Sequence, residues 1–200
     1  MKIRRTTLVL SILMVCGALS SGCSTTMKLR YAEPVAKEPI KGEISLVLDD
    51  QRPSNRGGDD TLRVGSVRNT FGMPFPLKAA AGREPVQVVK ELASDCLEAS
   101  GYRVVETSAG VPQLHASLLK FWTDGYQHSR MVVEMSLELR ADESAQPAWN
   151  HHLVSNTGVT WTAGYSQFDR GFTRTLDLAQ EELITQFSSP AFTGGYASAR

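Results

Sequence analysis

The most regular hydrophobic pattern of this chain lies between Met131 and Arg140. Its apolar positions, each separated by one residue, are Met131, Val133, Met135, Leu137 and Leu139. The residues between them are mostly polar: Val132, Glu134, Ser136, Glu138 and Arg140. Because successive side chains of a strand point to opposite faces, this pattern predicts a strand with one buried and one wet face. A wet face favours an antiparallel sheet, since wholly parallel sheets are covered on both faces.

Four other segments have weaker strand patterns. Residues 43–50 (EISLVLDD) alternate with one exception, and residues 62–71 are less regular. Residues 113–124 are separated from the strand around 131–140 by the turn-like DGYQHS, which predicts a hairpin. A last strand is expected from Trp149 to Trp161.

Two segments have the period of amphipathic helices. The first lies between Pro85, which suits a first helical turn, and Gly101, which suits a left-handed stop. Its apolar stripe consists of Val86, Val89, Ala93, Cys96 and Leu97. The second covers residues 166–187, with Ser166 as the expected N-cap. Gly171 weakens its first turns by up to ~1 kcal/mol relative to alanine.

These elements predict one α/β (α+β) domain over residues 43–192. The order β-β-α-β-β-β-α with one polar sheet face favours a two-layer sandwich. We expect a mostly antiparallel sheet of four to five strands with two helices packed on one face. Residues 23–42 contain prolines and mixed charges without a sustained period, which predicts a flexible tether. Small and polar residues in 193–200 predict a flexible tail.

Residues 1–22 have the layout of a secretory signal peptide. Three basic residues precede an apolar run of about 12 residues, shorter than the ~20 of a spanning helix. Small residues lie directly before Cys23, in a pattern that resembles the lipobox of bacterial lipoproteins. The resemblance implies a diacylglycerol cysteine and an acylated amino group, such as palmitate, as a membrane anchor. The alternative is ordinary cleavage near residues 16–18 or 19–21, which leaves Cys23 as a free thiol.

The signal peptide and the resemblance to a lipobox imply a location in the bacterial envelope. Ser24 stands where an aspartate tends to retain enteric lipoproteins in the inner membrane, so the resemblance implies the outer membrane, facing the periplasm. After removal of the leader and lipidation of Cys23, only Cys96 remains, and no intramolecular disulfide is possible. Because Cys96 falls on a helix stripe, we expect a buried small hydrophobe rather than a catalytic thiol.

Charge argues against nucleic acid as a partner. The leader holds three of the 21 basic residues and no acid, which leaves 18 basic against 21 acidic residues. No block of lysine and arginine occurs anywhere, so the electrostatic footprint of a nucleic-acid-binding protein is missing.

Three short segments resemble the YajG-like family of small bacterial lipoproteins: LDDQR at 48–52, VGSVRNTFG at 64–72 and LEASGYRVV at 97–105. The similarity covers roughly residues 43–187. It implies a sheet beneath two helices and an envelope address, and it implies no activity or catalytic residue, because none is established for the family. The residues in 50–52 and 68–72 are interpreted as strand-end and turn determinants.

Motifs for metal, cofactor or catalytic chemistry are not found. His151 and His152 are adjacent, so on a strand they face opposite sides and cannot chelate one metal. The loop 49–60 is rich in oxygen ligands but lacks the order of a calcium loop, and its arginines offset the charge. No nucleophile elbow or phosphate loop occurs. We therefore expect no metal, no cofactor and no enzyme.

Two sets of apolar residues are candidates for binding a partner. The segment 69–82 contains Phe71, Met73, Phe75 and Leu77 between prolines, and it either packs on the domain's own core or contacts a partner. The second set is Trp122, Tyr126 and Trp161, near the expected hairpin turn; the alternative for them is packing in the sheet core or pairing across strands.

Three functions remain open. The first is a non-enzymatic accessory or binding domain for an envelope protein or lipid partner. The second is a lipid or small-molecule carrier, which needs a roomy cavity between helices and sheet. The third is an envelope hydrolase, which needs a cleft joining histidine and aspartate with serine or cysteine.

Overall fold

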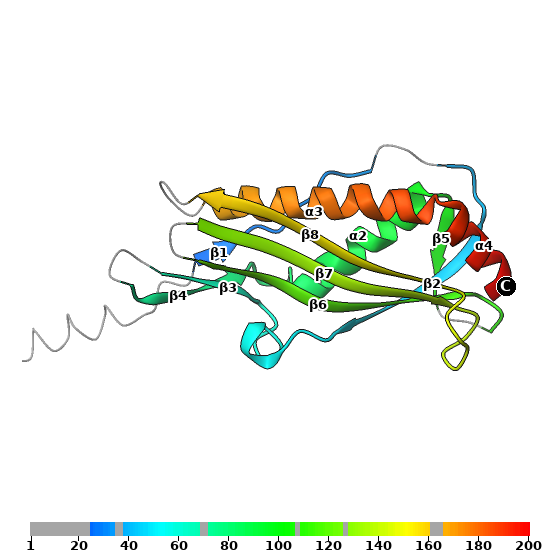
Figure 1. Cartoon of the computed structure of the whole chain (residues 1–200), viewed down its shortest axis with the longest axis horizontal. Helices are drawn as coiled ribbons and strands as arrows, with labels where there is room; N and C mark the ends of the chain where they lie inside the picture. Colours follow the sequence, from blue (N-terminus) through cyan, green and yellow to red (C-terminus); the bar gives the residue numbers. More distant parts are fainter. Residues whose placement is uncertain (1–24, 35–37, 69–71, 107–108, 126–127, 161–165) are drawn as a thin grey trace, which may run out of the picture.

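The computed structural model describes residues 25–34, 38–68, 72–106, 109–125, 128–160 and 166–200 (Figure 1). This part of the chain is an α+β fold with three α-helices and a mixed sheet of eight strands. The strands are β1 (Thr25–Met27), β2 (Gly42–Asp50), β3 (Arg63–Arg68), β4 (Pro74–Ala79), β5 (Tyr102–Val105), β6 (Gln113–Gly125), β7 (His128–Arg140) and β8 (Trp149–Thr160). The helices are the short 3-10 turn η1 (Ser54–Arg56), α2 (Pro85–Ala99), α3 (Ser166–Phe187) and α4 (Pro190–Ala199).

Strand β6 is the point at which the sheet forks. On one edge it pairs antiparallel with β7, which in turn pairs antiparallel with β8. On the other edge its first half, 113–118, pairs parallel with β2, and its last residues, 123–125, pair parallel with β3. One branch continues from β2 to β5, and the other continues from β3 to β4 and then β1. The register between β6 and β7 shifts between Leu118 and Lys120, so a bulge lies at the fork.

The loop 51–62 closes the fork around the side chain of Arg52, which is fully buried. Arg52 donates from Nε and Nη2 to the two carboxylate oxygens of Asp50, at 2.8 and 2.7 Å. It also donates to the carbonyl oxygens of Thr61 and Arg63. A Cβ on Gly57, whose φ is +106°, would lie 2.6 Å from Nη1 of Arg52. The prediction that 50–52 is a strand-end determinant is thus confirmed.

The helices α2 and α3 pack on one face of the sheet, as predicted. In Figure 1, α3 runs along β7 and β8, and η1 lies on the other side of the sheet. All five apolar residues of the alternating pattern in β7 have 0% exposure. Phe121 of β6 stacks on Phe172 of α3 with ring centroids 5.2 Å apart. Full burial of each such large side chain contributes about 1.5–3 kcal/mol, so this interface carries much of the fold's stability.

The sheet differs from the expected one in size and direction. It has eight strands instead of four to five, and four of its pairings are parallel, so it is mixed rather than mostly antiparallel. The additional strands β1, β4 and β5 are short and show no alternation that marks them. Pro74 and Pro76 made β4 look like a loop, yet β1 pairs only with residues 77–79, so the prolines interrupt no pairing on that edge.

The expected tether is packed from residue 25 onward. Met27 and Leu29 are buried, at 1% and 2% exposure. The backbone N–H groups of Lys28 and Ala32 donate to Asp169 and Asp177 of α3, both at 3.0 Å. Two buried residues, Met27 and Leu29, are enough to attach this segment, because the sheet edge and α3 supply its hydrogen-bond partners.

The expected flexible tail is helix α4. Ser189 caps it by accepting a hydrogen bond from the N–H of Phe192, and Pro190 occupies its first turn. Phe192 is fully buried, and Tyr196 Oη donates to the carbonyl oxygen of Glu43 at 2.9 Å. A Cβ on Gly195 would lie 2.8 Å from Trp149 Cβ, so the small residues that suggested fraying permit close packing.

Candidate functional site

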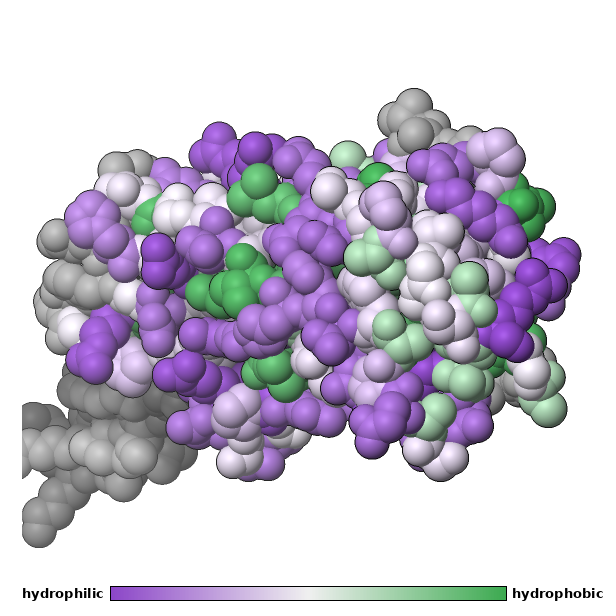
Figure 2. Space-filling view, turned by 45° about the vertical axis from the view of Figure 1, so that its right-hand side comes forward, coloured by the Kyte–Doolittle hydropathy of each residue, from purple (hydrophilic) through white to green (hydrophobic). Residues whose placement is uncertain are grey.

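The sheet face opposite α2 and α3, here called the open face, carries two hollows. On β7 and β8 it presents the polar residues that alternate with the core, and the loops 51–62 and 141–148 border it (Figure 1). Figure 2 shows the molecule turned so that the α4 end comes forward: small, separate hydrophobic groups lie among hydrophilic residues and residues of intermediate hydropathy. The large hydrophobic residues that are exposed in the described ranges are Ile40, Met73 and Val154.

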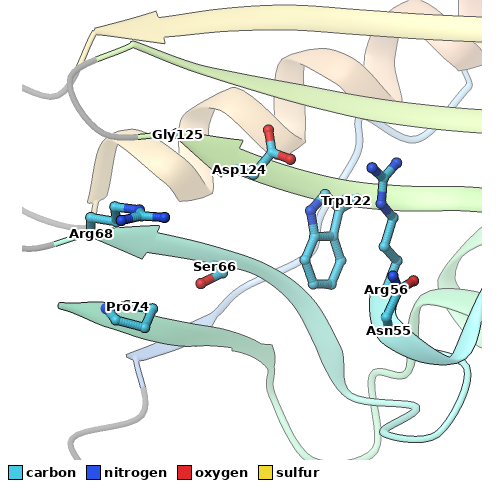
Figure 3. Close-up of a pocket in the computed structure, with 8 residues that line it drawn as sticks. All are labelled: Asn55, Arg56, Ser66, Arg68, Pro74, Trp122, Asp124 and Gly125. Atoms are coloured by element: carbon cyan, nitrogen blue, oxygen red, sulfur yellow. The ribbon is translucent and has the colours of Figure 1, made fainter. Parts of the chain in front are cut away.

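One hollow, the tryptophan hollow, has a volume of about 380 Å³ and lies between β3, β6 and η1 (Figure 3). It is lined by Asn55, Arg56, Ser66, Arg68, Pro74, Trp122, Asp124 and Gly125. Figure 3 shows Arg56 beside the indole ring of Trp122, with Arg68 and Asp124 toward the other end. The guanidinium of Arg63 lies 5.4 Å from the centroid of the Trp122 ring, within cation–π range.

The tryptophan hollow combines two cationic side chains with an aromatic ring. Arg56 and Arg68 are exposed and bring two planar cations to one opening. Guanidinium groups pair with carboxylates and phosphates through two parallel hydrogen bonds, and an indole offers an apolar wall. The lining contains one serine, Ser66, and no histidine or cysteine, so it lacks a nucleophile–base pair.

A second hollow, the polar groove, has about 590 Å³ and is lined by Asp49, Gln51, His115, Ser117, Leu119, Ser136, Glu138, Arg140 and Glu143. The strand register places Asp49, Ser117, Ser136 and His152 in one row across four strands. This set includes the residue types that an envelope hydrolase needs. His115 Nε2, however, lies 3.1 Å from Gln113 Oε1, and His152 Nε2 lies 3.2 Å from Glu134 Oε1. Within the described ranges, neither imidazole bonds a serine hydroxyl.

The adjacent histidines face opposite sides of the sheet, as predicted. His151 points to the helix layer, where its Nε2 lies 2.9 Å from Glu182 Oε1 of α3. His152 points to the open face. Across the residues that the structure describes, no group of three or more histidine, cysteine, aspartate or glutamate side chains could hold a metal ion.

Cys96 is a buried thiol in the interface between α2 and α3. Its Sγ lies 3.9 Å from the carbonyl oxygen of Gln180, and its exposure is 0%. Burial raises the pKa of the thiol to about 12, with a smaller contribution from the charge of Asp95. The group is therefore protonated at neutral pH and does not act as a nucleophile, as expected from its position on the helix stripe.

The structure divides the candidate partner-binding residues. The prediction that Leu77 contacts a partner is wrong. The alternation of β4 directs its side chain into the core, where its exposure is 0%. Phe75, on the same side of the strand, packs partly against the core. Met73 is 54% exposed. Trp122 is only 6% exposed, yet it forms a wall of the tryptophan hollow.

Other expected features lie outside the described residues. They are the leader 1–22 with Cys23, Phe71 of the apolar segment, Tyr126 of the hairpin turn, and Trp161. Conversely, sequence reasoning missed Arg68 and Asp124 as members of the tryptophan hollow, because Arg68 was interpreted as part of a turn determinant and Asp124 as part of the turn-like DGYQHS. Arg56 was noticed only as a residue that offsets charge.

None of the described helices is long and apolar enough to cross a membrane. No family model matches this chain, and no curated protein matches it. The fold nevertheless occurs in solved structures. Protein XCC0632 from Xanthomonas campestris, a DUF330 protein, is 14% identical with a TM-score of 0.63, over 88% of this chain and 100% of that chain.

Two further solved structures are similar over most of their length. An uncharacterized protein is 10% identical with a TM-score of 0.50, over 82% of this chain and 99% of that chain. Lipoprotein GNA1162 from Neisseria meningitidis is 12% identical with a TM-score of 0.38, over 75% and 99% of the two chains, a likeness too low to argue from. At these identities the comparisons show the fold alone: this chain shares its α+β architecture with a DUF330 protein.

Proposed function

We propose that this protein is a lipoprotein of the bacterial envelope, anchored by acyl chains on Cys23. The observation that carries the proposal is the order of residues 1–23: basic residues, a short apolar run, three small residues and a cysteine. Two or more acyl chains hold a protein firmly on a membrane, so the domain would stay attached. A location in the outer membrane facing the periplasm, and a relation to the YajG-like lipoproteins, are part of this proposal.

The folded domain acts as a non-enzymatic binding or accessory module. The space between α2, α3 and the sheet is filled with fully buried side chains, which supports binding at the surface over carriage in an internal cavity. The open face supplies the binding surface. Its tryptophan hollow presents two arginines and an indole, which suits a partner with an anionic group, either an envelope protein or a lipid.

Replacement of the anchoring cysteine tests the proposal. In cells that express the full chain, the Cys23→Ala variant should leave the membrane fraction and appear as a soluble envelope protein. Cys96→Ala is the matched control: it removes the other cysteine of the mature chain, and it should fractionate with membranes like the unaltered protein. Equal membrane association of Cys23→Ala and Cys96→Ala contradicts the lipid anchor.

A further inference from the structure

The folded domain begins almost at the proposed anchor. Thr25 is already paired with Leu77 in the sheet, and only one residue separates it from Cys23. Two residues of extended chain span at most about 7 Å. If Cys23 is lipidated, as the proposed function holds, the acyl chains enter the bilayer within that reach of β1. The domain then has no long tether on which to turn freely.

The direction of β1 fixes which end of the domain meets the membrane. Strands β1 and β4 are parallel, so the residues before Thr25 and the residues before Leu77 leave the sheet in the same direction. Met73 lies four residues before Leu77, at 54% exposure. In Figure 1, β1, β4 and the first turn of α3 lie at one end of the molecule, and β5 and α4 lie at the other.

Basic residues gather at the same end. Arg68 follows Val67, which pairs with Gly125, and Arg130 is paired with Asp124 on the neighbouring strand. Lys28 donates its backbone N–H to Asp169, next to Arg170 in the first turn of α3. Lys28, Arg68, Arg130 and Arg170 are all exposed, and within the described ranges none of them forms an ion pair.

At the opposite end, which holds β5 and α4 and is here called the far end, several basic residues form ion pairs. There, Lys41 pairs with Glu38, Arg103 with Glu43, and Arg140 with Glu138. Charges that are paired attract an anionic surface less than charges that are free. The contrast leaves four cations without a described ion pair at the end where β1 begins, where the acidic Asp124 and Asp169 also lie. Residues 23–200 as a whole hold more acidic than basic residues.

We propose that this end, formed by Lys28, Arg68, Met73, Arg130 and Arg170 and here called the anchor end, docks directly on an anionic bilayer. The four cations contact lipid phosphates, and Met73 enters the headgroup region. The occupant is the membrane that holds the acyl chains, because the short connection brings that surface to this end. Each lysine or arginine close to an anionic surface strengthens the attraction about fivefold.

A chain that begins at Ser24 tests the docking apart from the lipid. Every described strand and helix lies within residues 25–200, so this chain retains the whole fold. It should co-sediment with vesicles of phosphatidylcholine containing phosphatidylglycerol, and not with pure phosphatidylcholine. The double variant Arg68→Gln/Arg130→Gln should bind at least about tenfold more weakly. The control Lys41→Gln/Arg103→Gln removes the same charge at the far end and should bind normally.

A fluorescent label then reports the orientation. Met73→Cys and Ile40→Cys, the latter at a site 76% exposed near the far end, are labelled with an environment-sensitive thiol dye. The buried Cys96, whose thiol pKa is about 12, does not compete for the dye. Phosphatidylglycerol vesicles should shift the emission of the label at position 73 to the blue and leave that at position 40 unchanged.

The possible results separate this proposal from the lipid anchor. No binding to anionic vesicles, equal loss in the two double variants, or equal shifts of the two labels overturns the docking, whatever Cys23 carries. Selective binding through the anchor end supports the docking even if the Cys23→Ala variant remains with membranes, a result that would overturn only the lipid anchor.

Discussion

The two ends of this domain differ in their side chains: one is packed with aromatic rings, and the other exposes cations. At the far end, five aromatic residues from four elements interlock: Tyr102, Trp149, Phe187, Phe192 and Tyr196. At the anchor end the short strands β1 and β4 begin, and the exposed Met73 lies at the same end as four exposed cations. The far end is closed by internal packing and paired charges, whereas the anchor end leaves its charges free. The difference indicates that the far end stabilises the fold and the anchor end is available for contact.

The largest expected effect lies at the far end, in Phe192→Ala. Phe192 packs against Tyr102, Trp149 and Phe187 with ring centroids 5.3, 4.8 and 5.0 Å away. Its truncation should lower the free energy of unfolding by about 3–5 kcal/mol, because it leaves a cavity among rigid rings. Urea denaturation measures the loss. The exposed Ser198→Ala in the same helix should cost under about 0.5 kcal/mol. Equal stability of the two variants would mean that α4 is the frayed tail first expected from its composition.

Met27→Ala tests whether the anchor end is folded up to β1. Met27 is 1% exposed, and its truncation should cost about 2 kcal/mol or more, at the lower end of the range for core methionines because β1 is an edge strand. The exposed Arg30→Ala, three residues later, is the control and should be near neutral. If Met27→Ala and Arg30→Ala have the same denaturant midpoint, residues 25–34 are a tether and do not belong to the folded domain. The geometric argument for membrane docking would then fail.

Gly171→Ala should destabilise the protein, although glycine-to-alanine changes in exposed helices usually stabilise. Alanine has the higher helix propensity by up to about 1 kcal/mol. A Cβ at this position would, however, lie 2.6 Å from Val159 Cγ2 and 2.9 Å from Met131 Sδ. Overpacking of this kind costs about 1–3 kcal/mol, so the net change should be a loss of roughly 1 kcal/mol. Thermal denaturation measures it. A gain in stability would show that α3 and the sheet can separate at the anchor end.

The smallest expected effect is that of Lys78→Gln on β4. Lys78 lies 2.7 Å from Asp60, and its hydrogen bond holds the pKa of that carboxyl below its usual range. Because the folded pKa is the lower one, the pair stabilises the fold above the unfolded pKa, and its contribution disappears as the pH falls through the folded pKa. At neutral pH the variant should lose under about 1 kcal/mol, since the pair is exposed. Denaturation across the acid range should show this difference shrinking; a difference that grows in acid would contradict the pairing.

The long elements could be predicted from the sequence, and the short ones could not. Strands β6 to β8 and helices α2 and α3 each repeat a period over many residues, and their buried faces agree with that period. Strands β1 and β5, with three and four residues, are too short to show a period, and their parallel partners lie far away in the sequence. Gly171 was read as a weakness of the helix because its neighbours Met131 and Val159 are also distant.

The candidate site was predicted only in its apolar members. Trp122 attracts notice near an expected turn and Met73 in an apolar segment between prolines, and both lie where contact with a partner is possible. Arg68 lies on β3 and Asp124 on β6, and only the parallel pairing of these two strands brings them together. A site assembled across such a fork leaves no spacing signal in one sequence.

The central claim is that acyl chains on Cys23 hold the domain with its anchor end on the membrane. Intact-mass spectrometry of the protein extracted from its native membrane tests that claim most directly. We predict a mature chain that begins at Cys23 and carries the mass of a diacylglycerol group and an N-terminal acyl group. A chain with a different first residue, or with an unmodified Cys23, would contradict the account.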